Sequence, residues 1–94
     1  MNPKRAYLTI DDGPAANFRE KMGVLDERDI WALWFCTGAA IERQMDDAVH
    51  AIRKGHALGN HSFDHPRFSE VSLSEARRQI EETVRSRKDV ACAL

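Results

Sequence analysis

The sequence has few of the features that mark several common classes of protein. Cysteine is nearly absent: Cys36 and Cys92 are the only two, and they form neither a CxxC pair nor the spacing of a zinc ribbon. No apolar run approaches the roughly 20 residues that a membrane span requires, and the first residues do not form the apolar core of a signal peptide. We therefore expect no membrane partner and, for the chain as written, a cytoplasmic location.

An excess of positive charge is also missing, because 14 Lys and Arg oppose 15 Asp and Glu. Without a basic field to attract phosphates, nucleic acid is not expected as a partner. A length of 94 residues excludes a second domain, and 43% hydrophobic with 31% charged residues is typical of a soluble globular chain. We expect residues 1–94 to form one small domain.

Strand-like and helix-like patterns alternate along the chain. Three short runs rich in β-forming residues predict strands, at residues 6–10, 30–36 and 56–60. Apolar residues at helical spacing predict three helices, at residues 17–27, 41–52 and 73–88. Asn17 and the pair Ser72 and Glu75 are suited to begin helices, and Gly55 is suited to end one. The order β-α-β-α-β-α implies parallel strands joined by right-handed crossovers, and hence an α/β layered or barrel fold.

The large apolar residues predict where the core lies. Residues 30–36 are a continuous apolar run, as expected of a strand covered on both faces. Trp31, Trp34 and Phe35 in this run are therefore more plausible as core than as sugar-stacking residues, and Cys36 is expected to be a buried free thiol. The last helix is expected to bury an apolar stripe, made of Ala76, Ile80 and Val84.

Acidic and histidine residues follow two of the predicted strands. Asp11 and Asp12 come after the first strand, and His61 comes after the third. The carboxyl ends of parallel strands share one edge of a sheet, where active sites collect, so these residues are expected to face one small volume. Residues 11–14 (DDGP) alone are typical of a solvated turn. Their combination with the later histidines favours a metal site.

The segment HSFDH places His61 and His65 four residues apart, a spacing suited to holding one metal ion. Pro66 disfavours a helix here, and Ser62 stands where a zinc protease has glutamate, so a metal-binding loop is favoured over a protease site. Asn60 and Ser62 are placed to hydrogen-bond either around the metal site or within the loop itself.

Two imidazole nitrogens and one carboxylate oxygen would leave coordination positions open for water and substrate, which is typical of a catalytic site. Such an ion lowers the pKa of water and polarises a carbonyl, and a neighbouring carboxylate can accept the proton. The adjacent Asp11 and Asp12 can divide the roles of ligand and proton acceptor.

Four short segments resemble the motifs of one known family. Residues 9–14 (TIDDGP) resemble a TFDDGP motif, and residues 61–65 (HSFDH) match an H-S/T-x-x-H motif. Residues 32–38 (ALWFCTG) resemble an ATFFxxG strand, and residues 55–60 (GHALGN) resemble a GHE(I/L)GN segment. Over about residues 6–88, the chain is similar to the polysaccharide deacetylases, also called the NodB-homology group or carbohydrate esterase family 4.

The resemblance implies a fold and a set of roles. The fold would be the β-α-β-α-β-α portion of a deformed (β/α) barrel of NodB-homology type, incomplete in this chain. Asp12, His61 and His65 would bind a divalent metal, most simply zinc, and Asp11 would be the catalytic base that deprotonates the metal-bound water.

The resemblance also implies a reaction and its limits. The family hydrolyses the N-acetyl group of N-acetylglucosamine units in chitin, peptidoglycan or related glycans, or an O-acetyl group on xylan. The substrate would be an acetylated carbohydrate, and the enzyme a hydrolase of carbon–nitrogen bonds other than peptide bonds.

The family's later motifs, an RxPY-type segment and a late Leu-x-His that supplies the general acid, have no counterpart here. We expect weak or no activity for the chain alone, since losing an acid/base partner typically costs ~10²–10⁴-fold in rate. The alternative is a catalytically inactive, truncated remnant that keeps the α/β core and perhaps metal binding. An incomplete barrel would leave a strand edge and an apolar face open, which predicts a homo-oligomer.

Overall fold

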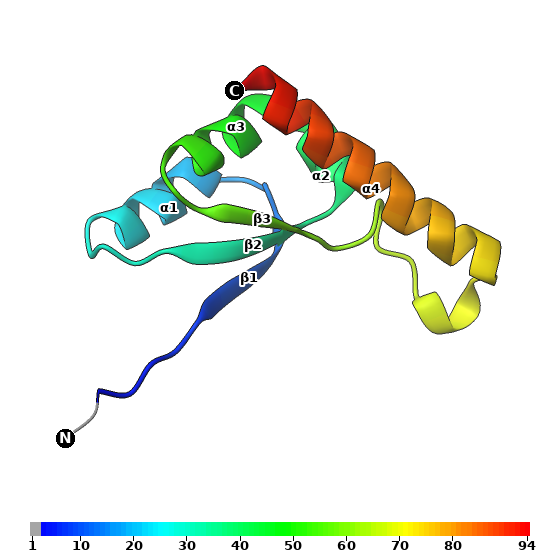
Figure 1. Ribbon diagram of the computed structural model, residues 1–94, viewed down its shortest axis with the longest axis horizontal. Coiled ribbons are helices and arrows are strands. Elements are labelled where there is room, and N and C mark those ends of the chain that lie inside the picture. Colours follow the sequence, from blue (N-terminus) through cyan, green and yellow to red (C-terminus); the bar gives the residue numbers. More distant parts are fainter. Residues whose placement is uncertain (1–2) are drawn as a thin grey trace.

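The computed structural model describes residues 3–94. Along the chain, its elements are β1 (Leu8–Gly13), α1 (Phe18–Asp26), β2 (Ala32–Cys36), α2 (Gly38–Arg43), α3 (Met45–Arg53), β3 (Ala57–Asn60), a 3-10 turn η1 (Phe68–Glu70) and α4 (Leu73–Ala93). The strands form a parallel sheet in the order β1-β2-β3, as the sequence predicts (Figure 1). No helix in the described part of the chain has both the length and the apolar character needed to cross a membrane.

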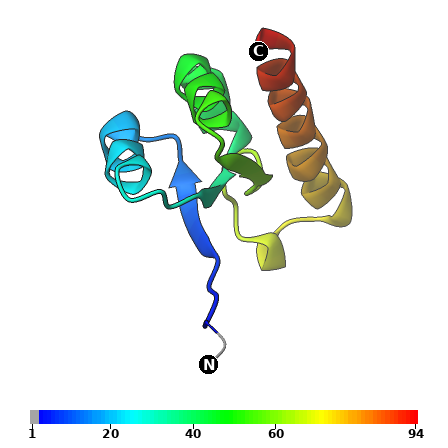
Figure 2. The ribbon, with the colours of Figure 1, turned by 60° about the vertical axis from the view of Figure 1, so that its left-hand side comes forward.

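Within residues 3–94, helices cover only one face of the sheet (Figures 1 and 2). In β2, Ala32, Trp34 and Cys36 are buried, whereas Leu33 and Phe35 between them are half-buried. Successive side chains of a strand point to opposite faces, and both views place the helices on one side of the sheet (Figures 1 and 2). The expectation that this strand is covered on both faces is therefore wrong for this chain.

The core lies between the covered face of the sheet and the helices. The Trp34 ring packs against Phe18 of α1 with ring centroids 4.7 Å apart, and Cys36 is fully buried. Both predictions of burial are confirmed. Trp31 was expected in the same core but is 50% exposed, because β2 begins only at Ala32 and Trp31 belongs to the preceding connection.

The helix boundaries differ from the sequence expectation in two places. The predicted helix 41–52 is two helices, α2 and α3, because Gln44 between them has φ −130° and ψ 52°. The N-cap of α2 is Thr37, whose side chain accepts a hydrogen bond from the Ala40 amide. Asn17 does not cap α1, since its backbone is left-handed and its side chain makes no capping bond. Gly55, with φ 92°, ends α3 as expected.

Helix α4 buries a face that the sequence did not predict. The Ser72 hydroxyl accepts the Glu75 amide, which confirms the predicted cap. Ile80 and Val84 of the expected apolar stripe are nevertheless 47% and 37% exposed. The buried positions of α4 are instead Gln79, Thr83, Ser86 and Val90. A mostly polar face of this helix therefore packs against α2, α3 and β3.

Candidate metal centre

Strand β1 ends in an irregularity that places Asp12. Asp11 pairs with Phe35 and Gly13 with Cys36, so Asp12 is an extra residue in the strand. Its φ of 66° lies in the left-handed region, which is uncommon for residues other than glycine. A bulge of this kind re-aims a side chain. The expectation that this strand ends at Ile10 and passes into a loop is therefore wrong, because the strand continues through the two aspartates to Gly13.

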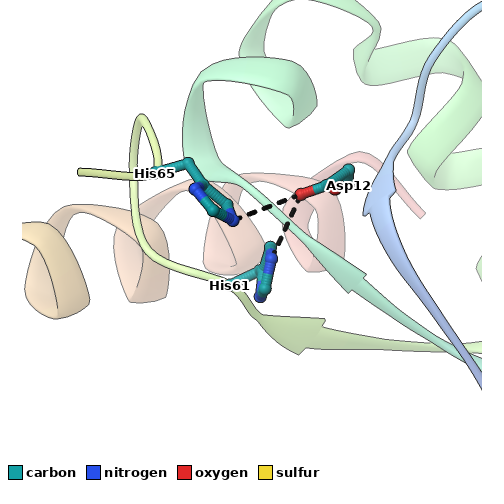
Figure 3. A group of neighbouring side chains, drawn as sticks. All are labelled: Asp12, His61 and His65. Carbon is teal, nitrogen blue, oxygen red and sulfur yellow. Dashed lines mark ion pairs between the residues drawn. The ribbon is translucent and has the colours of Figure 1, made fainter. Parts of the chain in front are cut away.

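The structure brings Asp12 to the two histidines of the HSFDH segment (Figure 3). Oδ1 of Asp12 lies 3.1 Å from Nε2 of His61 and 3.7 Å from Nε2 of His65. The two imidazole rings meet edge to face with centroids 4.7 Å apart. One donor atom from each of the three residues lies within 4.8 Å of the others. Residues from the carboxyl end of β1 and from the segment after β3 thus converge at one edge of the sheet.

These donors are suited to a divalent metal. Zinc ligands at about 2.0–2.2 Å in tetrahedral geometry lie roughly 3.3 Å from one another, close to the 3.1 and 3.7 Å that separate the Asp12 oxygen from the imidazoles. One carboxylate and two imidazoles match the preferences of zinc and similar ions. The Asp12 and His65 side chains are 66% and 61% exposed, so water and substrate have access.

Asp11 is next to this cluster in sequence but is not one of its members. It is exposed, and its pairing with Phe35 places it on the sheet face that the helices leave open. In a regular strand, the side chains of adjacent residues point to opposite faces of the sheet. The bulge at Asp12 breaks this alternation, so Asp11 and Asp12 can both lie near the carboxyl edge of the sheet. The role of Asp11 as a base stays a prediction.

The loop that carries both histidines has all its amide groups satisfied. Each N–H from residue 61 to residue 65 donates a hydrogen bond of 2.7 to 3.1 Å. The acceptors, in chain order, are the Cys36 carbonyl, the Asn60 side chain, Gln79 Oε1 twice, and the Ser62 hydroxyl. Asn60 and Ser62 thus make bonds that stabilise the loop, and the Asn60 amide also donates to the Ile80 carbonyl of α4.

Two carbonyl groups of the loop are held from the side of α2. The Gly38 and Ala39 amides donate to the carbonyls of Ser62 and Phe63 at 3.0 and 2.9 Å. Gly38 is needed for this approach, since a β-carbon built there would lie only 2.5 Å from the Phe63 ring. The loop is therefore fixed through its backbone by α2 on one side and by α4 on the other.

Gln79 of α4 is the residue that sequence reasoning missed. Its Oε1 accepts the Phe63 and Asp64 amides at 2.7 and 3.0 Å. Its Nε2 donates to the Asp64 and Glu75 carboxylates at 2.7 and 3.0 Å. Hydrogen bonds from Arg78 and then Gln79 lower the pKa of Glu75 to about 2, so this carboxylate is an acceptor at neutral pH.

A glutamine within a mixed-charge helix resembles a solvent-facing residue in sequence. The one feature of the sequence that could have pointed to a contact of Gln79 is its position four residues after Glu75. That spacing does not reveal which face of a helix is buried.

A pocket of about 470 Å³ lies beside the cluster, a size typical of small-ligand sites. Its lining combines the two histidines with apolar side chains and consists of Asn60, His61, Ser62, His65, Pro66, Phe68 and Ile80. Another hollow, of about 530 Å³, includes Asp12, Pro14, Ala40 and Arg43 in its wall.

The other two histidines, His50 and His56, lie outside this site. His56 is 4% exposed; its Nδ1 accepts the Ala32 amide and its Nε2 faces Asp26 Oδ1 at 2.8 Å. It therefore fastens the start of β2 to the end of α1. His50 is half-buried within α3.

Fold and site together describe a parallel α/β protein with two histidines and one aspartate grouped at the carboxyl edge of its sheet. Residues 1–91 match the family model described as polysaccharide deacetylase. A peptidoglycan-N-acetylglucosamine deacetylase of Bacillus cereus is 32% identical over 83 residues, which are 87% of this chain and 30% of that protein. A chitooligosaccharide deacetylase of Sinorhizobium fredii is 33% identical over 81 residues, 85% of this chain and 38% of that protein.

Among solved structures, the peptidoglycan deacetylase PdaC from Bacillus subtilis superposes with a TM-score of 0.85 and 28% identity, over 89% of this chain and 42% of that chain. The chain belongs to the polysaccharide deacetylase family. Its parallel β-α-β-α-α-β-α unit is part of the NodB-type α/β barrel, which confirms the predicted fold class. The chain spans only about a third of the length of the two curated relatives, 30% and 38%.

Proposed function

We propose that this chain binds a divalent metal, zinc in the first instance, through Asp12, His61 and His65. We further propose that the chain contributes the metal site and the catalytic base to the hydrolytic deacetylation of an N-acetylated or O-acetylated carbohydrate. The observation that supports it is the convergence of the Asp12 carboxylate and two imidazole nitrogens within 4.8 Å at the carboxyl edge of the sheet. Active sites of parallel α/β proteins collect at this edge.

The chemistry divides between the ion and the chain's own residues. A bound divalent ion would supply Lewis acidity to the acetyl carbonyl and to water. Asp11 accepts the proton of the attacking water. The exposed side chains of Asp12 and His65 leave the site accessible to that water. The bond from the carbonyl carbon to nitrogen or oxygen then breaks, which releases acetate, and the leaving group takes up a proton. We assign no residue of this chain to that proton donation, so we expect weak or no activity from the chain alone.

The substrate class rests on the relatives and on the pocket. Two relatives are named as deacetylases of peptidoglycan N-acetylglucosamine and of chitooligosaccharide. In this chain the 470 Å³ pocket joins the two histidines to the apolar surfaces of Phe68 and Ile80. Such a wall suits the apolar face of a sugar ring or an acetyl methyl group. The cytoplasmic location expected from the sequence stays a prediction.

Metal binding is tested by calorimetric titration of zinc into the chelator-treated protein. We expect wild type to bind one ion, and His61→Ala to lose affinity by on the order of 100-fold or more, since even partners outside the ligand set are worth 10–100-fold. His50→Ala is the matched control and should bind as wild type does. Equal heats for wild type and His61→Ala would remove the metal site from the proposal.

Catalysis is tested separately by acetate release from N-acetylglucosamine oligomers in the presence of the bound metal. Asp11→Asn removes the base while keeping all three ligands. Any wild-type rate should fall by about 10²–10⁴-fold in this variant. If zinc binds but wild type and Asp11→Asn release acetate equally slowly, the inactive remnant becomes the better description and the catalytic step is withdrawn.

A further inference from the structure

Gln79 of α4 contacts the loop between the two histidines while lying outside the ligand set. Its side chain is 1% exposed, and it reaches the backbone of Phe63 and Asp64, halfway between His61 and His65. We propose that Gln79 is a positioning residue that fixes the spacing of His61 and His65 for a divalent metal. This proposal rests on the metal site proposed above. It adds that a residue of α4, outside the loop, holds the loop in the shape that brings the two histidines together.

The argument begins with the conformation of the loop. His61 and His65 are four residues apart without a helix to align them, and Ser62 and His65 have left-handed φ values of 66° and 62°. Residues other than glycine keep such values only where their surroundings hold them. The amides of Phe63 and Asp64 are turned toward α4, where Gln79 is their acceptor. Without this oxygen, the two neighbouring amides of the loop in this partly buried contact with α4 would lose their partner.

The Nε2 atom of Gln79 fixes the orientation of the side-chain amide. Carboxylates accept and do not donate when ionised, so Nε2 must face Asp64 and Glu75, and Oε1 must face the two backbone amides. The side chain therefore has one orientation that satisfies every contact. A buried side-chain amide whose oxygen and nitrogen both have partners holds one conformation, and preorganised ligands depend on such support.

Thr83 offers a test of whether Gln79 matters only for stability. It lies one turn further along the same face of α4 and is fully buried, but its hydroxyl donates to the Gln79 carbonyl within the helix and not to the loop. Thr83→Val thus removes a buried polar group from the same interface while leaving the loop bonds intact. Gln79→Met removes the loop bonds with little change of side-chain length.

The experiment measures zinc affinity by calorimetry and amide exchange by NMR. Gln79→Met should bind zinc 10–100-fold more weakly than wild type, the effect typical of residues that orient metal ligands. Thr83→Val should bind as wild type does. Exchanging the hydrogen-bonding roles in Gln79→Glu/Asp64→Asn/Glu75→Gln keeps an acceptor for the loop amides and gives both former carboxylate partners an amide that can donate. This variant should restore most of the lost affinity.

Wild-type affinity in Gln79→Met, or an equal loss in Thr83→Val, would overturn the proposal. If Gln79→Met does not fold, amide exchange in metal-free wild type decides. Slow exchange of the Phe63 and Asp64 amides supports the proposed role of Gln79, and exchange as fast as in an open loop overturns it. Because this readout needs no metal, its failure is distinguishable from failure of wild type to bind zinc, which would instead contradict the proposed function.

Discussion

At the scale of single residues, the candidate site is built on unfavourable backbone conformations. Asp12, Ser62 and His65 have φ values of 66°, 66° and 62°. Each such residue costs on the order of 1–3 kcal/mol and persists only where the surrounding structure holds it. At Asp12 that support is the pairing of Asp11 and Gly13 with β2, and at the loop it is the set of backbone hydrogen bonds. The ligand positions therefore depend on tertiary contacts rather than on local preference.

The two cysteines differ at this same scale. Burial raises the pKa of the Cys36 thiol to about 12, whereas Cys92 is exposed on α4. The thiolate is the reactive form, so with Ellman's reagent at pH 8 we expect one thiol per folded chain to react quickly and the second only after unfolding. Cys92→Ser should abolish the fast reaction. Two fast thiols in the folded wild type would contradict the burial of Cys36.

At the scale of elements, the loop that carries His61 and His65 is held by the packing of α2 and α4 on either side of it. Amides at the start of α2 hold its carbonyls, and the buried polar face of α4 holds its amides. Neither helix supplies a ligand. The geometry of the site therefore depends on how α2 and α4 pack against the loop that follows β3.

A pair of glycine substitutions tests this packing. Gly38→Ala would place a β-carbon 2.5 Å from the Phe63 ring, whereas a β-carbon at Gly23 in α1 would meet nothing within 4 Å. We expect Gly38→Ala to lower the free energy of unfolding by about 1–3 kcal/mol through overpacking. Gly23→Ala should raise it by about 0.5–1 kcal/mol through helix propensity.

Urea denaturation followed by circular dichroism measures both changes. Zinc affinity should fall only in Gly38→Ala, because only that substitution displaces the loop. A Gly38→Ala protein as stable as wild type would show that the approach of α2 to the loop is not tight.

At the scale of the whole molecule, one face of the sheet lacks a cover within the described residues, and β1 and β3 are both edge strands there. Leu33 and Phe35 lie on the open face. The end of β3 lies beside Ile80 of α4, which is 47% exposed, and Asn60 donates to its carbonyl. Unpaired strand edges and exposed apolar surface both promote association. The homo-oligomer expected from the sequence thus has a specific surface to which it can be assigned.

We expect the isolated chain to self-associate in a concentration-dependent manner, measured by light scattering after size-exclusion chromatography. Ile80→Lys should weaken the association by placing a charge beside the β3 edge. Leu73→Lys is the control, since Leu73 is 91% exposed at the start of α4. A monomer throughout the concentration range would contradict the expectation.

The sequence by itself determined the alternation of strands and helices, the parallel sheet, and which residues are proposed as metal ligands. These follow from local patterns: β-rich runs bounded by turn residues, apolar residues at helical spacing, and chemical groups placed after strands. The burial of Trp34 and Cys36 and the cap at Ser72 were predictable for the same reason.

Only the tertiary structure decided which surfaces are buried and how the ligands are aimed. The exposure of Trp31, the break at Gln44 and the polar buried face of α4 depend on which elements meet, and no local pattern encodes that. Asp12 is aimed by a bulge that exists only because β1 pairs with β2. The loop of His61 and His65 is held by Gln79, 14 residues beyond His65 in the chain. Contacts between distant segments fix these geometries, because the local conformations alone are unfavourable.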